Sequence, residues 1–386
     1  MNDTVNEEGR LPVPLKVFGV LSIVGGLASL GDLAPVIFSF VQGVGGGTYR
    51  TASIVIFAGL MAVLTSSAVL FVFLGVRLLR NRRAHAAQAA NTLAALTVLA
   101  VIGTLMLFGL SAHHIGYLVQ IVILVAVTSY LDPQLHEERR LQRKLKKMDK
   151  EQRSEERRLA RERKPKKGFI TLNLFNLFWI FVVCCVLGLI IEVLFHFALY
   201  HEYQDRAGLL FGPFSPIYGF GALLMTIALN RFHDKPVWVV FLVSAVIGGA
   251  FEYFTSWIME FSFGIRAWDY SGTFLSIDGR TNFVFMVMWG VLGVAWIKLL
   301  LPRLLKLINL IPWNWRYAVT AVCAGLMLVD GVMTVQSIDC WYARSAGKAP
   351  DTPIEEFYAK HFDNAYMEHR FQTMTMDVND AARADR

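Results

Sequence analysis

The sequence predicts an all-α fold, a polytopic membrane helical bundle of about nine transmembrane helices. Hydrophobic residues make up 55% of the 386 residues and charged residues only 17%, and the mean hydropathy is +0.47. Several apolar runs reach the roughly 20 residues that a helix needs to cross a bilayer. Basic charge is concentrated in one segment, 136–167, which carries 15 Lys/Arg and 7 Asp/Glu. The chain is therefore expected to be a membrane protein with one charged insertion.

Nine apolar segments account for the expected helices. They cover about 15–41, 52–76, 91–110, 114–131, 170–199, 216–231, 236–261, 282–301 and 316–336. The charged segment separates the first four from the last five. The predicted organisation is an N-terminal four-helix membrane unit (1–131), a charged linker helix (132–168), a C-terminal five-helix unit (169–336) and a polar C-terminal tail (337–386).

The charged segment 136–167 alternates Glu with Lys and Arg and has few apolar positions. This pattern is typical of a solvated helix, which either serves as a spacer or touches anionic lipid. Because the excess positive charge of the chain is confined to this segment, contact with a membrane surface is a better interpretation than nucleic-acid binding.

The distribution of positive charge predicts the orientation of the segments. Four arginines follow the second segment, at positions 77, 80, 82 and 83, and the charged linker follows the fourth. Lys and Arg concentrate on the cytoplasmic side of membrane proteins. We therefore expect a multi-pass membrane protein with the N-terminus and 136–167 in the cytoplasm. The connections after the fifth and seventh segments, and the tail, would then lie outside.

Two acidic residues interrupt the apolar segments of the C-terminal unit. Glu192 lies in the fifth segment and Glu252 in the seventh, both in the outer half of the predicted membrane. A carboxylate at membrane depth costs on the order of a few kcal/mol, so it usually has a partner and a task. Glu260 and Ser256 follow Glu252 at intervals of four residues, which places all three on one helix face.

The two external loops supply expected partners for these acids. Arg206 and Arg280 are suited to carboxylates because a guanidinium group can donate two parallel hydrogen bonds. We expect them to neutralise Glu192 and Glu252, or to engage an anionic group of a substrate. The candidate substrate-binding or pathway residues are Glu192, Arg206, Tyr218, Glu252, Tyr253, Glu260, Trp268, Asp269 and Arg280.

The residues leave three interpretations of this constellation open: a substrate or ion pathway, a structural lock between helices, and catalysis. Catalysis has the least support, because no GxSxG or HExxH motif is present and the pair Glu192 and His196 lacks a third metal ligand. The four cysteines show no metal-binding spacing. We predict no catalytic residue, no metal site and no cofactor.

The loop residues also resemble a known family. The resemblance rests on Arg206, Gly208, Gly212-Pro213, Pro216-Ile217-Tyr218-Gly219, Glu252-Tyr253, Glu260, Trp268-Asp269-Tyr270-Ser271 and Gly279-Arg280. In this order they are similar to the bacterial CmpB-like membrane proteins described as putative ABC-transporter type IV, over about 172–310. The resemblance implies a permease in a bacterial cytoplasmic (plasma) membrane that works with a separate ATPase subunit. No Walker A sequence, GxxxxGK[ST], occurs in the chain.

The sequence thus predicts a multi-pass membrane protein that acts as a transporter permease component with a polar site in its outer half. Its expected partners are the lipid bilayer, a separate ATPase and a substrate that the sequence does not identify; nucleic acid is not among them. Two alternatives stay open. One is a membrane-embedded enzyme acting on lipid or envelope precursors, and the other is a non-transporting scaffold or sensor.

Overall fold

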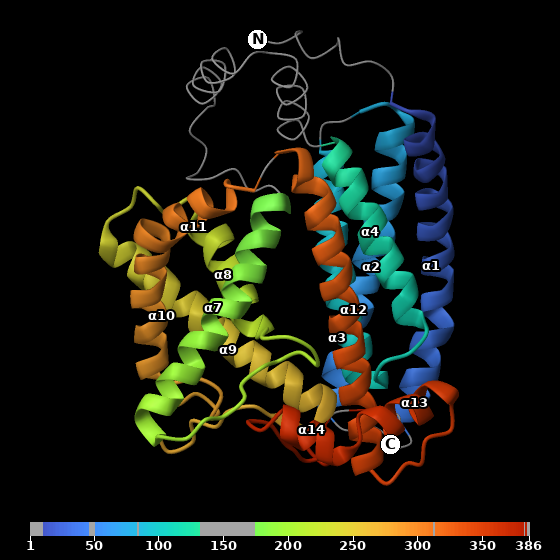
Figure 1. The fold of residues 1–386 in the computed structure, drawn as a ribbon. Helices are drawn as coiled ribbons and strands as arrows, with labels where there is room; N and C mark the ends of the chain where they lie inside the picture. The colour runs from blue at the N-terminus through green and yellow to red at the C-terminus, as the bar shows by residue number, and fades with distance from the viewer. Residues whose placement is uncertain are drawn as a thin grey trace, which may run out of the picture. The chain divides into compact units, whose positions relative to one another are not determined.

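The computed structural model describes residues 11–45, 51–82, 85–131, 174–311, 313–381 and 383, and it is almost entirely helical in these ranges (Figure 1). The chain divides into two compact units, Met1–Lys164 with Ala382–Arg386, and Pro165–Ala381. The predicted charged helix at 136–167 lies outside the described residues, so it stays a prediction.

The N-terminal unit contains four helices, each packed on the next along the chain. They are α1 (Val13–Gly45), α2 (Thr51–Leu79), α3 (Ala86–Phe108) and α4 (His113–Leu131). Small residues bring α1 and α2 close together, since a Cβ added at Gly26 would lie 2.7 Å from the carbonyl oxygen of Ala68. Close approach of this kind is common between membrane helices.

The C-terminal unit begins with α7 (Leu174–Tyr200), α8 (Pro216–Leu229) and α9 (Val237–Phe263). A nearly continuous helical stretch follows, made of α10 (Phe283–Ala295), the π-helical turn η1 (Trp296–Leu300) and α11 (Leu301–Ile308). The long helix α12 (Trp313–Ser345) leads to two short helices, α13 (Pro353–His361) and α14 (Asn364–Arg370).

Within the described residues, seven helical stretches, with α10, η1 and α11 counted as one, are long and apolar enough to cross a membrane, which supports a multi-pass membrane protein. The segments expected at 114–131 and 216–231 form shorter apolar helices, so the count of nine spans stays a prediction. Helix α12 extends to Ser345, nine residues beyond the end expected at 336. The extra turns are amphipathic and bury Cys340, Trp341 and Tyr342, which apolar run length alone does not reveal.

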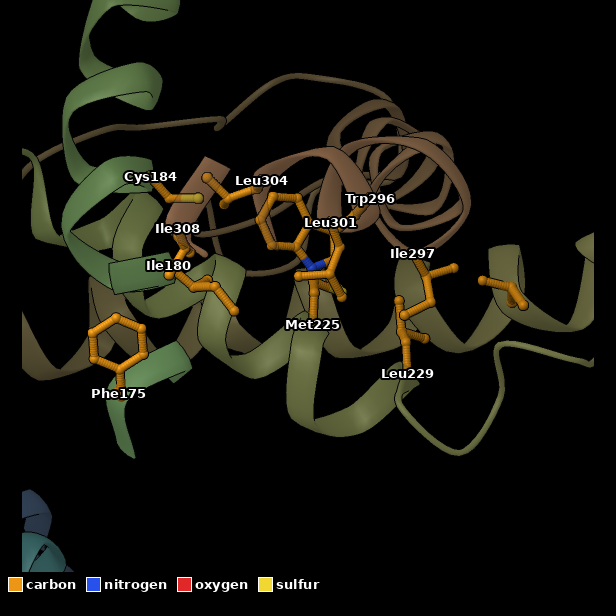
Figure 2. Packing of buried hydrophobic residues seen from close by; sticks show 11 residues of the cluster. Phe175, Ile180, Cys184, Met225, Leu229, Trp296, Ile297, Leu301, Leu304 and Ile308 are labelled. Atoms are coloured by element: carbon orange, nitrogen blue, oxygen red, sulfur yellow. The ribbon is translucent and has the colours of Figure 1, made fainter. Parts of the chain in front are cut away.

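The apolar core of the C-terminal unit lies among α7, α8, α9 and the α10–α11 stretch. Figure 2 shows side chains from these helices pointing toward one another, among them Ile180, Met225, Trp296 and Leu301. The indole nitrogen of Trp296 donates to Thr226 Oγ1 at 2.9 Å, which satisfies its only polar group inside the core.

The segment after α12 folds back onto the two loops that were expected to be external. Strand β2 (Thr375–Met376) pairs antiparallel with β1 (Ile265–Arg266), which directly follows α9. Figure 1 shows α14 at the end of this unit opposite to α11. The loops at 201–215 and 264–282 therefore share one end of the unit with the tail.

Candidate functional site

A column of polar side chains runs along one face of α9. Glu252, Ser256 and Glu260 are all buried, with 7%, 2% and 9% of their surface exposed. They follow one another at four-residue intervals, the spacing that keeps residues on one helix face. Gly248 and Gly249 precede them on the same buried side. This face packs against the loop that connects α9 to α10.

Two hydroxyl groups hold Glu252. Tyr270 donates to its Oε1 at 2.9 Å, and Thr281 Oγ1 donates to its Oε2 at 2.8 Å. The expected partner, Arg280, is instead bonded to Glu260, so that part of the prediction is wrong. The reason is the geometry of the loop: Thr281, the neighbour of Arg280, reaches Glu252, while Arg280 lies one to two turns farther along α9.

Glu260 accepts from two arginines. Arg280 Nη1 lies 2.6 Å from its Oε2 and Arg266 Nη2 lies 3.3 Å from its Oε1. The side chains of Arg280 and Glu260 are only 9% and 11% exposed, whereas that of Arg266 is 46% exposed. Arg280 and Glu260 thus form a nearly buried ion pair, and removing either side chain would leave the charge of the other buried without compensation.

A tight turn positions Arg280. Asp278 and Gly279 both have positive φ, 55° and 67°, and the Arg280 amide donates to the carbonyl of Ile277. Asp-Gly with two positive φ angles is typical of a type I′ hairpin turn. Asp278 also accepts from Arg280 Nε at 2.9 Å, and Trp268 Nε1 donates to the Arg280 carbonyl at 2.9 Å.

Two more predicted residues, Asp269 in this loop and Tyr253 in α9, lie close to the turn. Asp269 accepts from the Ser271 amide at 2.8 Å, and this hydrogen bonding to Ser271 holds the pKa of Asp269 below its usual range, with Arg266 adding to the effect. Tyr253 donates to Asp278 at 3.4 Å, and its ring lies 5.9 Å from the Arg280 guanidinium carbon. These contacts fix the loop on α9.

A second cluster joins α7, α8 and the loop between them. Arg206 Nη1 donates to Glu192 Oε1 at 2.7 Å, and Tyr218 donates to Glu192 Oε2 at 2.6 Å. Here the expected partner of Glu192 is the observed one. The ring of Tyr218 lies against Gly188, where any Cβ would collide with it. A glycine at 188 is thus required for Tyr218 to reach Glu192.

Tyr270 links the two clusters electrostatically. Burial raises the pKa of Tyr270, and the negative charges of Glu252 and, to a smaller degree, Glu192 raise it further. The phenol therefore stays protonated and donates its hydrogen bond to Glu252. Tyr270 belongs to the residues that carry the family resemblance, but neither Tyr270 nor Thr281 was among the predicted site residues. Each is the sequence neighbour of a predicted residue, Asp269 and Arg280 respectively.

A pocket of about 360 Å³ opens at the end of α9 beside the Arg280–Glu260 pair. Of the nine predicted residues, Glu260, Trp268, Asp269 and Arg280 line it. The other lining residues are Ser256, Arg266, Ser271, Gly272, Ser276, Asp278 and Gly279. The remaining five predicted residues are not among the lining residues, and Glu252 lies one helical turn before Ser256, beneath the pocket.

The tail contributes contacts that the sequence did not suggest. Arg370 Nη1 donates to Asp205 Oδ2 at 2.6 Å, and its other nitrogens donate to the carbonyls of Leu209 and Gly212. Leu210 is buried with Trp341, Phe362, Met367 and Phe371. The tail thereby holds the loop that carries Arg206.

Within the described ranges, no group of three His, Cys, Asp or Glu residues could hold a metal ion. Three of the four thiols, those of Cys184, Cys185 and Cys340, are buried and free.

The comparison with protein families bears on the C-terminal unit, where both clusters lie. Residues 179–335 match the family described as putative ABC-transporter type IV. This family match covers all nine candidate residues, from Glu192 in α7 to Arg280 before α10, and ends within α12. It confirms the resemblance predicted from the loop motifs. No curated protein and no solved structure matches the chain significantly.

Proposed function

We propose that this chain is the membrane-spanning permease component of a transporter, and that the pocket at the end of α9 receives a polar group of the substrate. One observation carries the proposal: at the end of an otherwise apolar bundle, a pocket of about 360 Å³ has charged side chains converging on it. Small-molecule sites commonly measure about 300–1,000 Å³ and have a few convergent polar groups. The match to a family named for ABC transporters supports the same function.

The charges around the pocket limit the kind of group that it suits. Its ionisable lining residues are Glu260, Arg266, Asp269, Asp278 and Arg280, which give a formal charge of −1. Both arginines already donate to carboxylates. An anionic ligand would have to displace those carboxylates, at the cost of leaving buried charge unpaired. A hydroxyl-bearing or cationic group fits better than an anion.

The energy for transport would come from a separate subunit. The sequence has no GxxxxGK[ST] motif that could cradle nucleotide phosphates. The proposed complex therefore pairs this chain with an ATPase, in the bacterial cytoplasmic membrane that the family resemblance implies.

Ligand-dependent thermal stability tests the pocket. The full chain in detergent would be melted with polyols, amines and organic anions of headgroup size, since a ligand that binds only the folded state raises Tm. We expect a polyol or an amine to raise Tm, and Asp269→Asn to weaken that shift. Glu192→Gln, outside the pocket, is the matched control. A shift that survives Asp269→Asn but disappears in Glu192→Gln would contradict the pocket assignment.

A scaffold is the second candidate, and one observation favours it. Both carboxylate oxygens of Glu192, Glu252 and Glu260 accept hydrogen bonds from protein groups. Acids satisfied in this way can hold helices and loops in register with no substrate present. The two candidates differ in whether the charge of these acids is needed once the protein has folded.

A further inference from the structure

The loop between α9 and α10 exposes three large apolar side chains. Phe274, Leu275 and Ile277 are 67%, 62% and 51% exposed; we name these three residues the apolar tip. Exposed apolar clusters of this kind usually mark a contact with another molecule or with a membrane. The same loop lines the polar pocket. The environment of the apolar tip therefore determines from which environment, water or lipid, a ligand enters the pocket.

The loop has two chemically different sides. Gly272, Ser276 and Asp278 line the pocket, and the members of the apolar tip lie between them in the sequence but are absent from the lining. The backbone turns sharply here, since Leu275 and Asp278 have φ angles of 49° and 55°. Such angles are unfavourable for residues other than glycine.

The apolar tip continues the exposed apolar surface of α10. The ring of Phe274 meets that of Phe283, the first residue of α10, with centroids 5.7 Å apart. Val284, Met288 and Val291 extend this surface along the helix, each more than 50% exposed. An exposed apolar surface of this extent marks a contact with lipid or with another protein.

The length of this helical stretch places its start near a membrane surface. The candidate membrane span runs over 26 residues, Phe283–Ile308, or about 39 Å at 1.5 Å per residue. The hydrocarbon core of a bilayer is about 30 Å thick. A stretch of this length crosses the core with its first residue, Phe283, at or just beyond one edge, so the preceding loop 272–280 is expected at that surface.

From this continuity we propose that the apolar tip inserts into the bilayer interface and binds lipid, holding the mouth of the polar pocket at the level of the headgroups. Apolar side chains at this depth are buried at the boundary between headgroups and acyl chains. The polar side of the loop stays hydrated. A second copy or another protein would have to cover the tip and the adjoining lipid-facing surface of α10 together, which makes lipid the better occupant. Insertion of the apolar tip does not require that the chain transport a substrate.

Spin-label accessibility in lipid nanodiscs tests this proposal. The full-length Leu275→Cys variant, made in a Cys323→Ser background to limit labelling of the least buried native thiol, would carry a nitroxide. Collisions with oxygen, which concentrates in lipid, are compared with collisions with a water-soluble nickel chelate. Val291→Cys on α10 is the lipid reference, and Glu368→Cys on α14, exposed and charged, is the aqueous reference.

We expect the oxygen-to-nickel ratio at position 275 to exceed that of Glu368→Cys several-fold and to approach that of Val291→Cys. Phe274→Cys should give the same result if Leu275→Cys fails to fold. A ratio equal to the aqueous reference would overturn the proposal, because the tip would lie in water. Exclusion of both reagents would also overturn it, because the tip would then be covered by protein.

Discussion

Arg280 and Glu260 form an ion pair across 2.6 Å, although 20 residues separate them in the chain. The pair attaches the loop after α9 to the last turns of that helix. Arg266 adds a second, more exposed donor at 3.3 Å. Around this pair the structure gathers the pocket, the tight turn at Asp278-Gly279 and the hydroxyl groups that hold Glu252.

Removal of Arg280 should destabilise the protein strongly. Arg280→Met leaves Glu260 with only its exposed partner, and breaking a buried pair typically costs about 3–5 kcal/mol. We expect a clear fall in Tm when the variant is melted in detergent. Arg266→Gln is the control, because an exposed ion pair contributes about 0–1 kcal/mol. If the double variant Arg280→Met/Glu260→Leu is as unstable as the sum of the two single variants, the pair is not coupled.

A methyl group at position 188 should disturb the Glu192 cluster. Any Cβ there collides with the ring of Tyr218, and overpacking of this kind costs about 1–3 kcal/mol. Gly188→Ala should lower Tm and weaken the Tyr218–Glu192 hydrogen bond. The matched control is Gly331→Ala in α12, where a Cβ would meet nothing within 4 Å. Equal melting temperatures for the two variants would mean that Tyr218 does not occupy this position.

Much of this site could be predicted from sequence where the pattern is local. The spacing of Glu252, Ser256 and Glu260 determines a common helix face, and Arg206 lies close enough in sequence to Glu192 to return to it. Arg280 was assigned to the wrong acid, because two positive φ angles in the preceding turn decide where its side chain points.

The tail contacts could not be predicted for a different reason. Arg370 and Asp205 are 165 residues apart, and neither lies in a motif that indicates a partner. The apolar residues that bury Leu210 come from α12, α13 and α14, whose short amphipathic patterns do not specify which surface they cover. The pairing of β1 with β2 likewise joins segments that are far apart in the sequence, 265–266 and 375–376.

Loss of the Arg370 contacts should loosen the loop at 201–215. Arg370→Gln removes the ion pair with Asp205 and weakens the hydrogen bonds to the carbonyls of Leu209 and Gly212. We expect faster amide hydrogen exchange in 205–212, with α9 unchanged. Glu368→Gln, which alters an exposed residue of the same helix, should leave exchange at its original rate. Unchanged exchange in Arg370→Gln would show that other tail contacts suffice.

Stability at alkaline pH should depend on Tyr270. Its pKa is raised by burial and by Glu252, so the folded state binds the phenolic proton more tightly than the unfolded state, whose pKa is about 10. The stabilisation is therefore complete below about pH 10 and is lost as the pH rises above it. Tyr270→Phe should show a shallower fall in Tm above pH 10 than the parent protein. Parallel curves would contradict the burial of this hydroxyl.

Removing the charge of Glu252 distinguishes a functional role of this residue from a purely structural one. In Glu252→Gln the side chain keeps its shape and can still hydrogen-bond with Tyr270 and Thr281, so we expect normal membrane insertion and a melting temperature close to the parent value. Complementation of a deletion strain should nevertheless fail. Normal complementation by this variant would favour the scaffold, and loss of folded protein would point to a purely structural role.

The most direct test of the permease proposal is co-purification from native membranes. The full chain, crosslinked in intact cells and isolated in mild detergent, would be analysed by mass spectrometry and assayed for ATP hydrolysis. We predict that a second subunit with a Walker A motif co-purifies in a fixed ratio to this chain, and that ATPase activity is found in the fractions that contain both. Recovery of the crosslinked chain without any ATP-hydrolysing subunit would contradict the account.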